Sequence, residues 1–269
     1  MHNIALNWCP NMHSDDLEVK KDDDSPASSS IKRVSAVNLS RTLFDNEYWG
    51  REPIIISDVV SSWKAYGRWN PGYLRRTVRS NPTSVHYNEK GIFDLGAGKT
   101  YLLPFGQCVD LIESAQGHMY YIQQRSLLMD FPDLLADIDL PYLLDGGKRL
   151  QVINLWFGGR GCKSPLHHDR SDNFLAQVYG SKHVILYSPR NTRGLYPFRE
   201  SFRSHCSQVN VFEPDDETFP LYSSVKALRK AFRLNAGEML YIPSRWWHAV
   251  DSLEVSISVN FWWNQVQRK

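Results

Sequence analysis

The feature that most constrains the fold is a series of strand-like runs in the second half of the chain. β-Branched and aromatic residues dominate these runs, and glycine, proline or asparagine interrupts them. The runs are QVINLWFGG, NFLAQVYGSKHVILYS, KAFRLNAGEMLYIPS and VSISVNFWW. Several short strands separated by such turn residues are typical of a β-sandwich or β-barrel. We therefore predict a mainly β domain whose core spans about residues 150–263.

The first half of the chain predicts a mixture of helices and strands around that core. Within 38–49 the apolar residues Leu39, Leu43 and Phe44 recur at helical spacing, so we expect them to share one face. The other predicted elements are helices over 70–80 and 105–115, strands over 53–60 and 118–124, and a proline-broken, partly helical connection over 127–144.

Residues 14–33 differ in composition from the rest of the chain. They contain two acidic clusters, a proline and a run of serines. Such a segment buries too little apolar surface to fold alone. We therefore predict a flexible tail over 1–33, or an arm that docks on the protein, followed by one domain over 34–269.

The overall charge and the cysteines narrow the classes of function. Charged residues make up 22% of the chain and the net charge is +2, so there is no global electrostatic case for nucleic-acid or membrane binding. No apolar run approaches the ~20 residues of a membrane span. The four cysteines form no CxxC pair, which argues against a disulfide framework and a cysteine zinc site. We expect a cytoplasmic protein, or a nuclear one if the chain is eukaryotic.

A histidine–x–aspartate pair in the run SPLHHDRSDNF has the arrangement of a metal site. If the run is extended, His167 and Asp169 point to one side and His168 to the other, because side chains alternate along a strand. A third ligand is offered by His248 in GEMLYIPSRWWHAVDS. Two histidines and one carboxylate leave coordination positions open, which suits non-haem Fe(II) better than a structural zinc site. The alternative is a local hydrogen bond between His167 and Asp169, with His248 as a core histidine.

Five stretches occur in an order that is typical of one family. They are INLWFGG (153–159), SPLHHDRSDNFLAQVYGSKHVILYSP (164–189), LYPF (195–198), GEMLYIPSRWWHAV (237–250) and SISVNFWW (256–263). YYIQQ (120–124) and REPIIISDVVSSWKA (51–65) extend the match toward the N-terminus. In these stretches the chain resembles the JmjC-type 2-oxoglutarate oxygenases. Among them it is most similar to the asparaginyl hydroxylase of hypoxia-inducible factor and to the JmjC arginyl hydroxylases.

The resemblance implies a fold and a set of site residues. The fold is a double-stranded β-helix, also called the jelly roll or cupin fold, with N-terminal helices and strands packed around it. Fe(II) would be bound by His167, Asp169 and His248, with 2-oxoglutarate and dioxygen as co-substrates. The family's other site positions correspond to Lys182, Ser164 and Tyr121 for the distal carboxylate of 2-oxoglutarate, Asn173 and Asn260 in the co-substrate pocket, and Trp262 near the iron.

Lys182 lies in the run YGSKHVILYS, which otherwise has the pattern of a buried strand. An unpaired ammonium group in such a place is costly, so we expect an anionic partner. The sequence offers no acid at a matching spacing, whereas 2-oxoglutarate brings a free carboxylate. The alternative is that the side chain of Lys182 extends to solvent from the end of the strand.

The implied function is hydroxylation of a C–H bond in a protein or peptide residue, with release of succinate and carbon dioxide. The alternatives are a JmjC lysine demethylase, a nucleic-acid or small-molecule hydroxylase and, last, a non-redox cupin. A non-redox cupin has no reason to combine Lys182, Ser164 and Tyr121 with the metal ligands. Four arginines are candidates for contacts with phosphate or an acidic peptide, or form only a solvated surface: Arg190, Arg193, Arg199 and Arg203.

The end of the chain bears on the expected assembly. Six residues follow Trp263. The asparaginyl hydroxylase resembled here continues into C-terminal helices that form its dimer. We therefore do not transfer that dimer, and expect a monomer that binds a protein or peptide substrate and no membrane.

Overall fold

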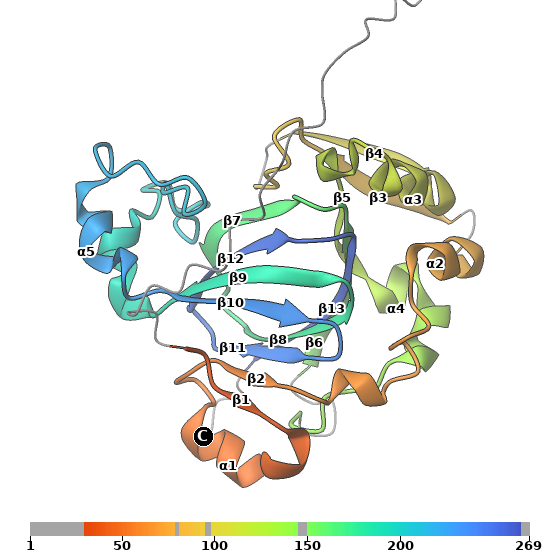
Figure 1. The fold of residues 1–269 in the computed structure, drawn as a ribbon, viewed down its shortest axis with the longest axis horizontal. Coiled ribbons are helices and arrows are strands. Elements are labelled where there is room, and N and C mark those ends of the chain that lie inside the picture. Colours follow the sequence, from red (N-terminus) through yellow and green to blue (C-terminus); the bar gives the residue numbers. More distant parts are fainter. Residues whose placement is uncertain (1–29, 79–80, 95–97, 145–149, 265–269) are drawn as a thin grey trace, which may run out of the picture.

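Two β-sheets that face each other form the centre of the computed structural model, which describes residues 30–78, 81–94, 98–144 and 150–264 (Figure 1). The larger sheet has nine strands in the order β1-β2-β11-β8-β13-β6-β5-β3-β4, and the smaller has four in the order β10-β9-β12-β7. Among the described residues, the paired strands run antiparallel, apart from β1 with β2, which are parallel. This arrangement confirms the prediction of a mainly β, jelly-roll architecture.

The strands are distributed over the whole described chain. Those of the larger sheet are β1 (Arg33–Val34), β2 (Ile54–Ile56), β3 (Pro82–Tyr87), β4 (Lys99–Pro104), β5 (Tyr120–Ser126), β6 (Leu150–Gly158), β8 (Asp172–Tyr179), β11 (Met239–Ile242) and β13 (Ser256–Trp263). Those of the smaller sheet are β7 (Lys163–His168), β9 (Ser181–Tyr187), β10 (Lys230–Asn235) and β12 (Trp247–Ser252).

Short helices surround the sheets. They are α1 (Arg41–Glu47), α2 (Pro71–Val78), α3 (Phe105–Glu113), α4 (Leu127–Asp130) and α5 (Ser223–Lys226), with 3-10 turns at Ala36–Asn38, Val60–Ser62, Gly117–Met119, Pro132–Asp137, Pro189–Leu195 and Pro220–Tyr222. Figure 1 shows α2, α3 and α4 along one side of the molecule and α5 on the opposite side. No helix in the described ranges is long and apolar enough to cross a membrane.

Strand alternation divides each central strand between a core face and a pocket face. On β13, Phe261 and Trp263 belong to the largest apolar cluster, which also contains side chains of α1 to α4. The alternate residues of the strand, Asn260 and Trp262, line a pocket between the two sheets. A single strand thus contributes both to the core and to the site.

The helix predicted within 38–49 forms, but the three apolar residues do not share one face as predicted. Ser40 caps α1 by accepting a hydrogen bond from the backbone of Leu43, so the buried Leu39 lies before the helix. Phe44 takes the core position, with its ring 5.6 Å from that of Phe174. Leu43 precedes Phe44 by one residue and is therefore rotated about 100° away around the helix. Its side chain is 41% exposed.

The folded part of the chain begins earlier than the predicted boundary at residue 33. Ile31 is buried in an apolar cluster with residues of both sheets. Arg33 begins β1 and forms an ion pair with Glu238 over 2.9 Å. Residues 30–33 therefore dock on the domain, as in the second of the two predictions for this segment. The apolar side chain of Ile31 is buried, and Arg33 pairs with an acidic residue. The rest of the predicted tail, with its acidic clusters and Cys9, lies outside the described residues.

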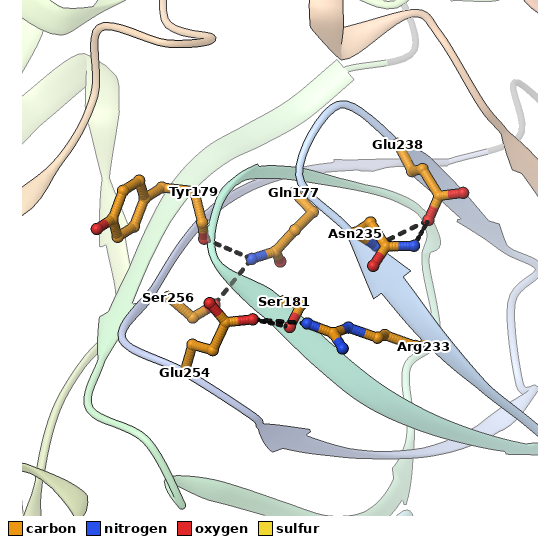
Figure 2. A network of polar contacts seen from close by, with 8 residues as sticks. All are labelled: Gln177, Tyr179, Ser181, Arg233, Asn235, Glu238, Glu254 and Ser256. Atoms are coloured by element: carbon orange, nitrogen blue, oxygen red, sulfur yellow. Dashed lines mark hydrogen bonds and ion pairs between the residues drawn. The ribbon is translucent and has the colours of Figure 1, made fainter. Parts of the chain in front are cut away.

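A polar network closes one end of the space between the sheets (Figure 2). The side chain of Gln177 donates to the carbonyl of Tyr179 and to the hydroxyl of Ser256 over 2.7 and 2.9 Å. Glu254 accepts hydrogen bonds from Ser181 and Arg233. These contacts join β8 and the β8–β9 turn to β10, to the β12–β13 connection and to the start of β13. Gln177, Ser181 and Ser256 are at most 2% exposed, so buried polar side chains close this end.

The β8–β9 turn itself requires glycine. Gly180 has a φ of +67°, in the left-handed region that L side chains rarely adopt. A Cβ atom there would lie 2.2 Å from the carbonyl oxygen of Val255. The tight turn places Ser181 and Lys182 at the closed end.

Candidate active site

A single pocket between the two sheets brings together all nine residues that the sequence indicates as a site. Its complete lining is Tyr121, Trp156, Ser164, His167, Asp169, Asn173, Leu175, Lys182, Ile242, His248, Val250, Asn260 and Trp262. The smaller sheet supplies the two histidines and the lysine, and the larger sheet supplies the asparagines and most of the aromatic rings. The pocket therefore depends on the two sheets facing each other.

Three candidate metal ligands lie at one end of this pocket. His167 on β7 and His248 on β12 are direct cross-strand partners, and their ring centroids are 4.2 Å apart. Asp169 follows β7, and its Oδ2 lies 3.7 Å from Nε2 of His248. One ligand atom from each residue lies within 4.8 Å of the other two. No other group of three or more histidine, cysteine or acidic side chains with metal-binding geometry occurs among the described residues.

Neighbouring groups orient all three ligands. The Nδ1 atoms of His167 and His248 lie 2.8 and 3.1 Å from the carbonyl oxygens of Pro165 and Trp246. A carbonyl only accepts, so each Nδ1 carries the proton and each Nε2 keeps its lone pair for a metal. Oδ2 of Asp169 accepts a hydrogen bond from the indole N–H of Trp262 over 3.1 Å.

The environment of His248 keeps its imidazole neutral. Burial, followed by the nearby His167, lowers the pKa of His248 to about 4. A neutral imidazole is the form that binds a metal ion. The free Nε2 atoms, the oriented carboxylate and the neutral ring all fit a divalent cation held by two histidines and one carboxylate.

His168 faces away from this group, as strand alternation predicts. It pairs in register with Trp247, and the two rings meet edge to face at 4.7 Å. The ring of His205 lies 6.4 Å away on the same side. Burial is the main cause that lowers the pKa of His168. The two adjacent histidines of the HHD run thus have different surroundings, and only His167 belongs to the pocket.

Lys182 lies toward the closed end of the pocket and is 2% exposed. Its Nζ donates to the hydroxyl of Ser252 over 3.2 Å and lies 5.6 Å from the centre of the Tyr121 ring. No ion pair within 4.0 Å is found for Lys182 among the described residues. Burial therefore lowers its pKa to about 8. This rules out the alternative of a side chain that extends to solvent. Within the described part of the chain, Lys182 is a buried cation with one hydrogen-bond acceptor, the hydroxyl of Ser252.

The other residues predicted near Lys182 are also there. Tyr121 is buried, and burial raises the pKa of its hydroxyl well above the usual value, while a hydrogen bond with Ser164 opposes that shift. Its ring packs against Trp156 at 6.0 Å and Phe93 at 5.2 Å. The polar end of the pocket is thus built from an ammonium group and neutral hydroxyl groups.

The two predicted asparagines are linked across adjacent strands. Asn260 Nδ2 donates to Asn173 Oδ1 over 3.1 Å, and Asn260 Oδ1 accepts from Nε1 of Trp156 over 2.8 Å. Asn173 and Asn260 are 6% and 1% exposed, so these contacts are shielded from water.

Five residues at this site were not predicted from the sequence. Four line the pocket and the fifth accepts the hydrogen bond of Lys182: Trp156, Leu175, Ile242, Val250 and Ser252. A period of two identifies three of them, because Leu175 follows Asn173 by two positions, and Val250 and Ser252 follow His248 by two and four. No comparable signal marks Trp156 or Ile242.

The four arginines beside the LYPF stretch do not form one basic patch of free side chains. Arg190, Arg193 and Arg199 are exposed. Arg203 is half-buried, pairs with Asp94 over 2.6 Å and lies over the ring of Phe198. Cys108, Cys162 and Cys206, the cysteines within the described ranges, are buried and form no disulfide.

Comparisons with known proteins agree with this architecture. The sequence profile of the cupin-like domain matches residues 40–269. The chain is 32% identical to lysine-specific demethylase 8 of Xenopus tropicalis, over 80% of this chain and 48% of that protein. It is 34% identical to lysine-specific demethylase JMJ30 of Arabidopsis thaliana, over 87% and 54%. It is 29% identical to the human bifunctional peptidase and (3S)-lysyl hydroxylase JMJD7, over 79% and 77%.

The extent of these matches defines what they show. The chain spans about half the length of the two demethylases, so similarity to them does not by itself assign the activity of those whole proteins to it. The profile match covers nearly all of the described domain. A Jumonji C domain-containing protein of Drosophila melanogaster is also 31% identical over 79% of the chain. This chain belongs to the cupin-like domain family, among its JmjC members.

Proposed function

We propose that this domain is an Fe(II)- and 2-oxoglutarate-dependent oxygenase that hydroxylates a C–H bond of a protein or peptide residue. The observation that carries the proposal is the combination of two groups in one pocket. His167, Asp169 and His248 converge at one end. Lys182 is buried at the other end and forms no ion pair within 4.0 Å to a described acid, so a carboxylate of 2-oxoglutarate would neutralise it there. A non-redox cupin would not need this second group.

Each pocket residue has a defined task in this proposal. His167, Asp169 and His248 would hold iron and leave its remaining positions to co-substrates. The bound iron would supply dioxygen activation, coupled to the decarboxylation of 2-oxoglutarate to succinate. Lys182 and the hydroxyl groups around it orient the co-substrate carboxylate. The side chains of Leu175, Ile242 and Val250 exclude water from the middle of the pocket.

The names of the relatives support a protein residue as the substrate. One relative is named a (3S)-lysyl hydroxylase and two are named lysine-specific demethylases. Oxidation of an N-methyl group is therefore the second candidate reaction. We place the substrate entrance at the end of the pocket beside His167, which forms an isolated β-bridge with Cys206 of the segment after Pro189–Leu195.

Mass spectrometry distinguishes the candidate reactions. The purified protein is incubated with Fe(II), 2-oxoglutarate and peptide libraries, and with the same peptides carrying methylated lysine. Hydroxylation adds one oxygen atom, whereas demethylation removes a methyl group and releases formaldehyde. Oligonucleotide and free amino-acid arms test the remaining substrate classes. The proposal of an oxygenase fails if no arm yields succinate above the level of the His248→Ala variant.

A further inference from the structure

A chain of three side chains crosses the pocket wall from β6 through β13 to β8. Trp156 donates to Asn260 over 2.8 Å, and Asn260 contacts Asn173 over 3.1 Å. Trp156 is half-buried and the two asparagines are almost fully buried. All three line the pocket between the sheets.

The indole group of Trp156 determines which atom donates and which accepts in these two hydrogen bonds. Indole N–H only donates, so the Asn260 atom that faces Trp156 must be its oxygen. The other terminal atom of Asn260 is then its NH2 group, which donates to Asn173. The contacting atom of Asn173 must therefore be its oxygen as well. The positions of the heavy atoms therefore fix the orientation of both side-chain amides, because each contact has one chemically allowed assignment.

The NH2 group of Asn173 is the free end of the chain. Asn173 is 6% exposed and lines the pocket. Across the described residues, no protein acceptor is found for its Nδ2 atom. Because Asn173 lines the pocket, its NH2 group can donate a hydrogen bond to an acceptor on a bound molecule.

We infer that Trp156 is a positioning residue that acts through Asn260 to present the NH2 group of Asn173, and not its oxygen, to an oxygen atom of 2-oxoglutarate. The inference rests on the proposed function for the identity of that ligand. Packing holds the Trp156 indole in place, because its ring lies 6.0 Å from that of Tyr121. The ammonium group of Lys182 lies over the same Tyr121 ring. Trp156 thus contacts Asn260 through its N–H group and Tyr121 through its ring, so it connects the two asparagines with the end of the pocket that contains Lys182.

Substitutions at Asn173 test the polarity of the group that faces the ligand. Asn173→Ala removes one hydrogen bond and should raise the dissociation constant of 2-oxoglutarate by up to about tenfold. Asn173→Asp can still accept from Asn260, but presents a carboxylate where the NH2 group was. It should therefore weaken binding at least tenfold more than Asn173→Ala, and binding should recover as the pH is lowered. Anaerobic calorimetry on Mn(II)-loaded protein measures both values without turnover.

Trp156→Phe tests the positioning role, because it removes the indole N–H and keeps an aromatic ring. We expect the dissociation constant of 2-oxoglutarate to rise several-fold while that of the metal stays within twofold. In the metal-free protein, Asn260→Ala should shift the NMR resonance of the Trp156 indole proton, which Trp156→Phe identifies by its loss. Trp69→Phe is the matched control, since its indole donates to Asp137 outside the pocket.

The outcomes separate this inference from the proposed function. If the wild-type protein binds metal but no 2-oxoglutarate, the proposed function is wrong. If the wild-type protein binds 2-oxoglutarate and Asn173→Asp binds it as well as Asn173→Ala does, the assigned polarity is wrong. If Trp156→Phe leaves 2-oxoglutarate affinity unchanged, Trp156 has no positioning role.

Discussion

The indole N–H of Trp262 donates a hydrogen bond to Oδ2 of Asp169 over 3.1 Å. The same oxygen is 3.7 Å from Nε2 of His248, so Trp262 holds the carboxylate toward the other candidate ligands. Groups that orient metal ligands typically contribute 10–100-fold to metal affinity. We therefore expect Trp262→Phe to weaken Fe(II) binding about tenfold, as measured by anaerobic competition with a chromophoric chelator.

Trp69→Phe is the control for that measurement. Trp69 also donates its indole N–H to a carboxylate, Asp137, over 3.0 Å, but in the core away from the pocket. Its loss should lower the free energy of unfolding and leave metal affinity unchanged. Equal metal affinity in Trp262→Phe and the wild-type protein would show that Trp262 does not orient Asp169.

The contrast between His167 and His168 gives a second prediction. His167→Ala, Asp169→Ala and His248→Ala should each abolish turnover, because each removes a proposed ligand. His168→Ala should retain one bound Fe(II), since its ring packs on Trp247 away from the pocket. Metal content after anaerobic gel filtration measures this directly. Equal loss of metal in the His167 and His168 variants would contradict the assignment.

Lys182→Met should separate co-substrate binding from stability. Charge-assisted hydrogen bonds contribute roughly 1.5–3 kcal/mol each, so the variant should bind 2-oxoglutarate at least tenfold more weakly, with Fe(II) affinity little changed. In the metal-free protein the variant should be more stable. The depression of the Lys182 pKa from 10.5 to about 8 corresponds to an upper bound of about 3 kcal/mol at neutral pH.

Urea unfolding of the metal-free protein and calorimetry of the metal-loaded protein check the two halves of this prediction. Lys226→Met is the control, because Lys226 forms an exposed pair with Asp216 and should change both quantities little. A destabilised Lys182→Met protein with normal 2-oxoglutarate affinity would remove Lys182 from the site.

The same pKa predicts how co-substrate affinity depends on pH. Below about pH 8 Lys182 is protonated and can pair with a carboxylate, whereas above it the free protein must take up a proton on binding. The dissociation constant of 2-oxoglutarate should therefore rise by up to about tenfold per pH unit above pH 8. In Lys182→Met this dependence should disappear. Calorimetry between pH 6.5 and about 9.5 would refute the role of Lys182 if both proteins gave parallel profiles.

Above pH 8, where 2-oxoglutarate should bind more weakly, the free energy of unfolding of the metal-free protein should increase. Between the folded pKa of about 8 and the ordinary value of 10.5, the unfolded chain keeps the Lys182 proton that the folded chain has lost. The free energy of unfolding therefore gains a contribution that increases with pH in this window. The difference between wild-type and Lys182→Met unfolding curves at pH 7 and pH 10 isolates this contribution, and a constant difference would contradict it.

Much of the site could be predicted because the relevant residues lie in strands with a strict period. Alternation placed His167 and His168 on opposite sides, and the structure confirms this through the register His248–His167 and Trp247–His168. The resemblance to JmjC oxygenases supplied the contacts that are distant in sequence, such as Lys182 with Tyr121. Periodicity alone could not have paired these two residues, because they lie on different sheets.

The features that were missed depend on tertiary context. The edge strand β4 and its neighbour β3 were not predicted, since PTSVHY and KTYLLP begin or end with proline and the second is largely exposed. Leu43 was predicted to share a face with Leu39 and Phe44 because the pattern did not show that the helix begins at Arg41, after Leu39. Trp156 lies in the INLWFGG motif, but no role was predicted for it. Its indole N–H donates to Asn260, which is 104 positions later in the sequence, so local patterns do not reveal this contact.

The two faces of β13 have a consequence for how such a domain can diversify. Phe261 and Trp263 hold the strand in the core, while Asn260 and Trp262 face the pocket. Substitutions at the second pair can change ligand chemistry while the apolar packing that folds the strand is kept. A one-residue deletion would instead exchange the two sets of side chains and abolish both properties. The strand is therefore tolerant of new chemistry by substitution and intolerant of changes in length.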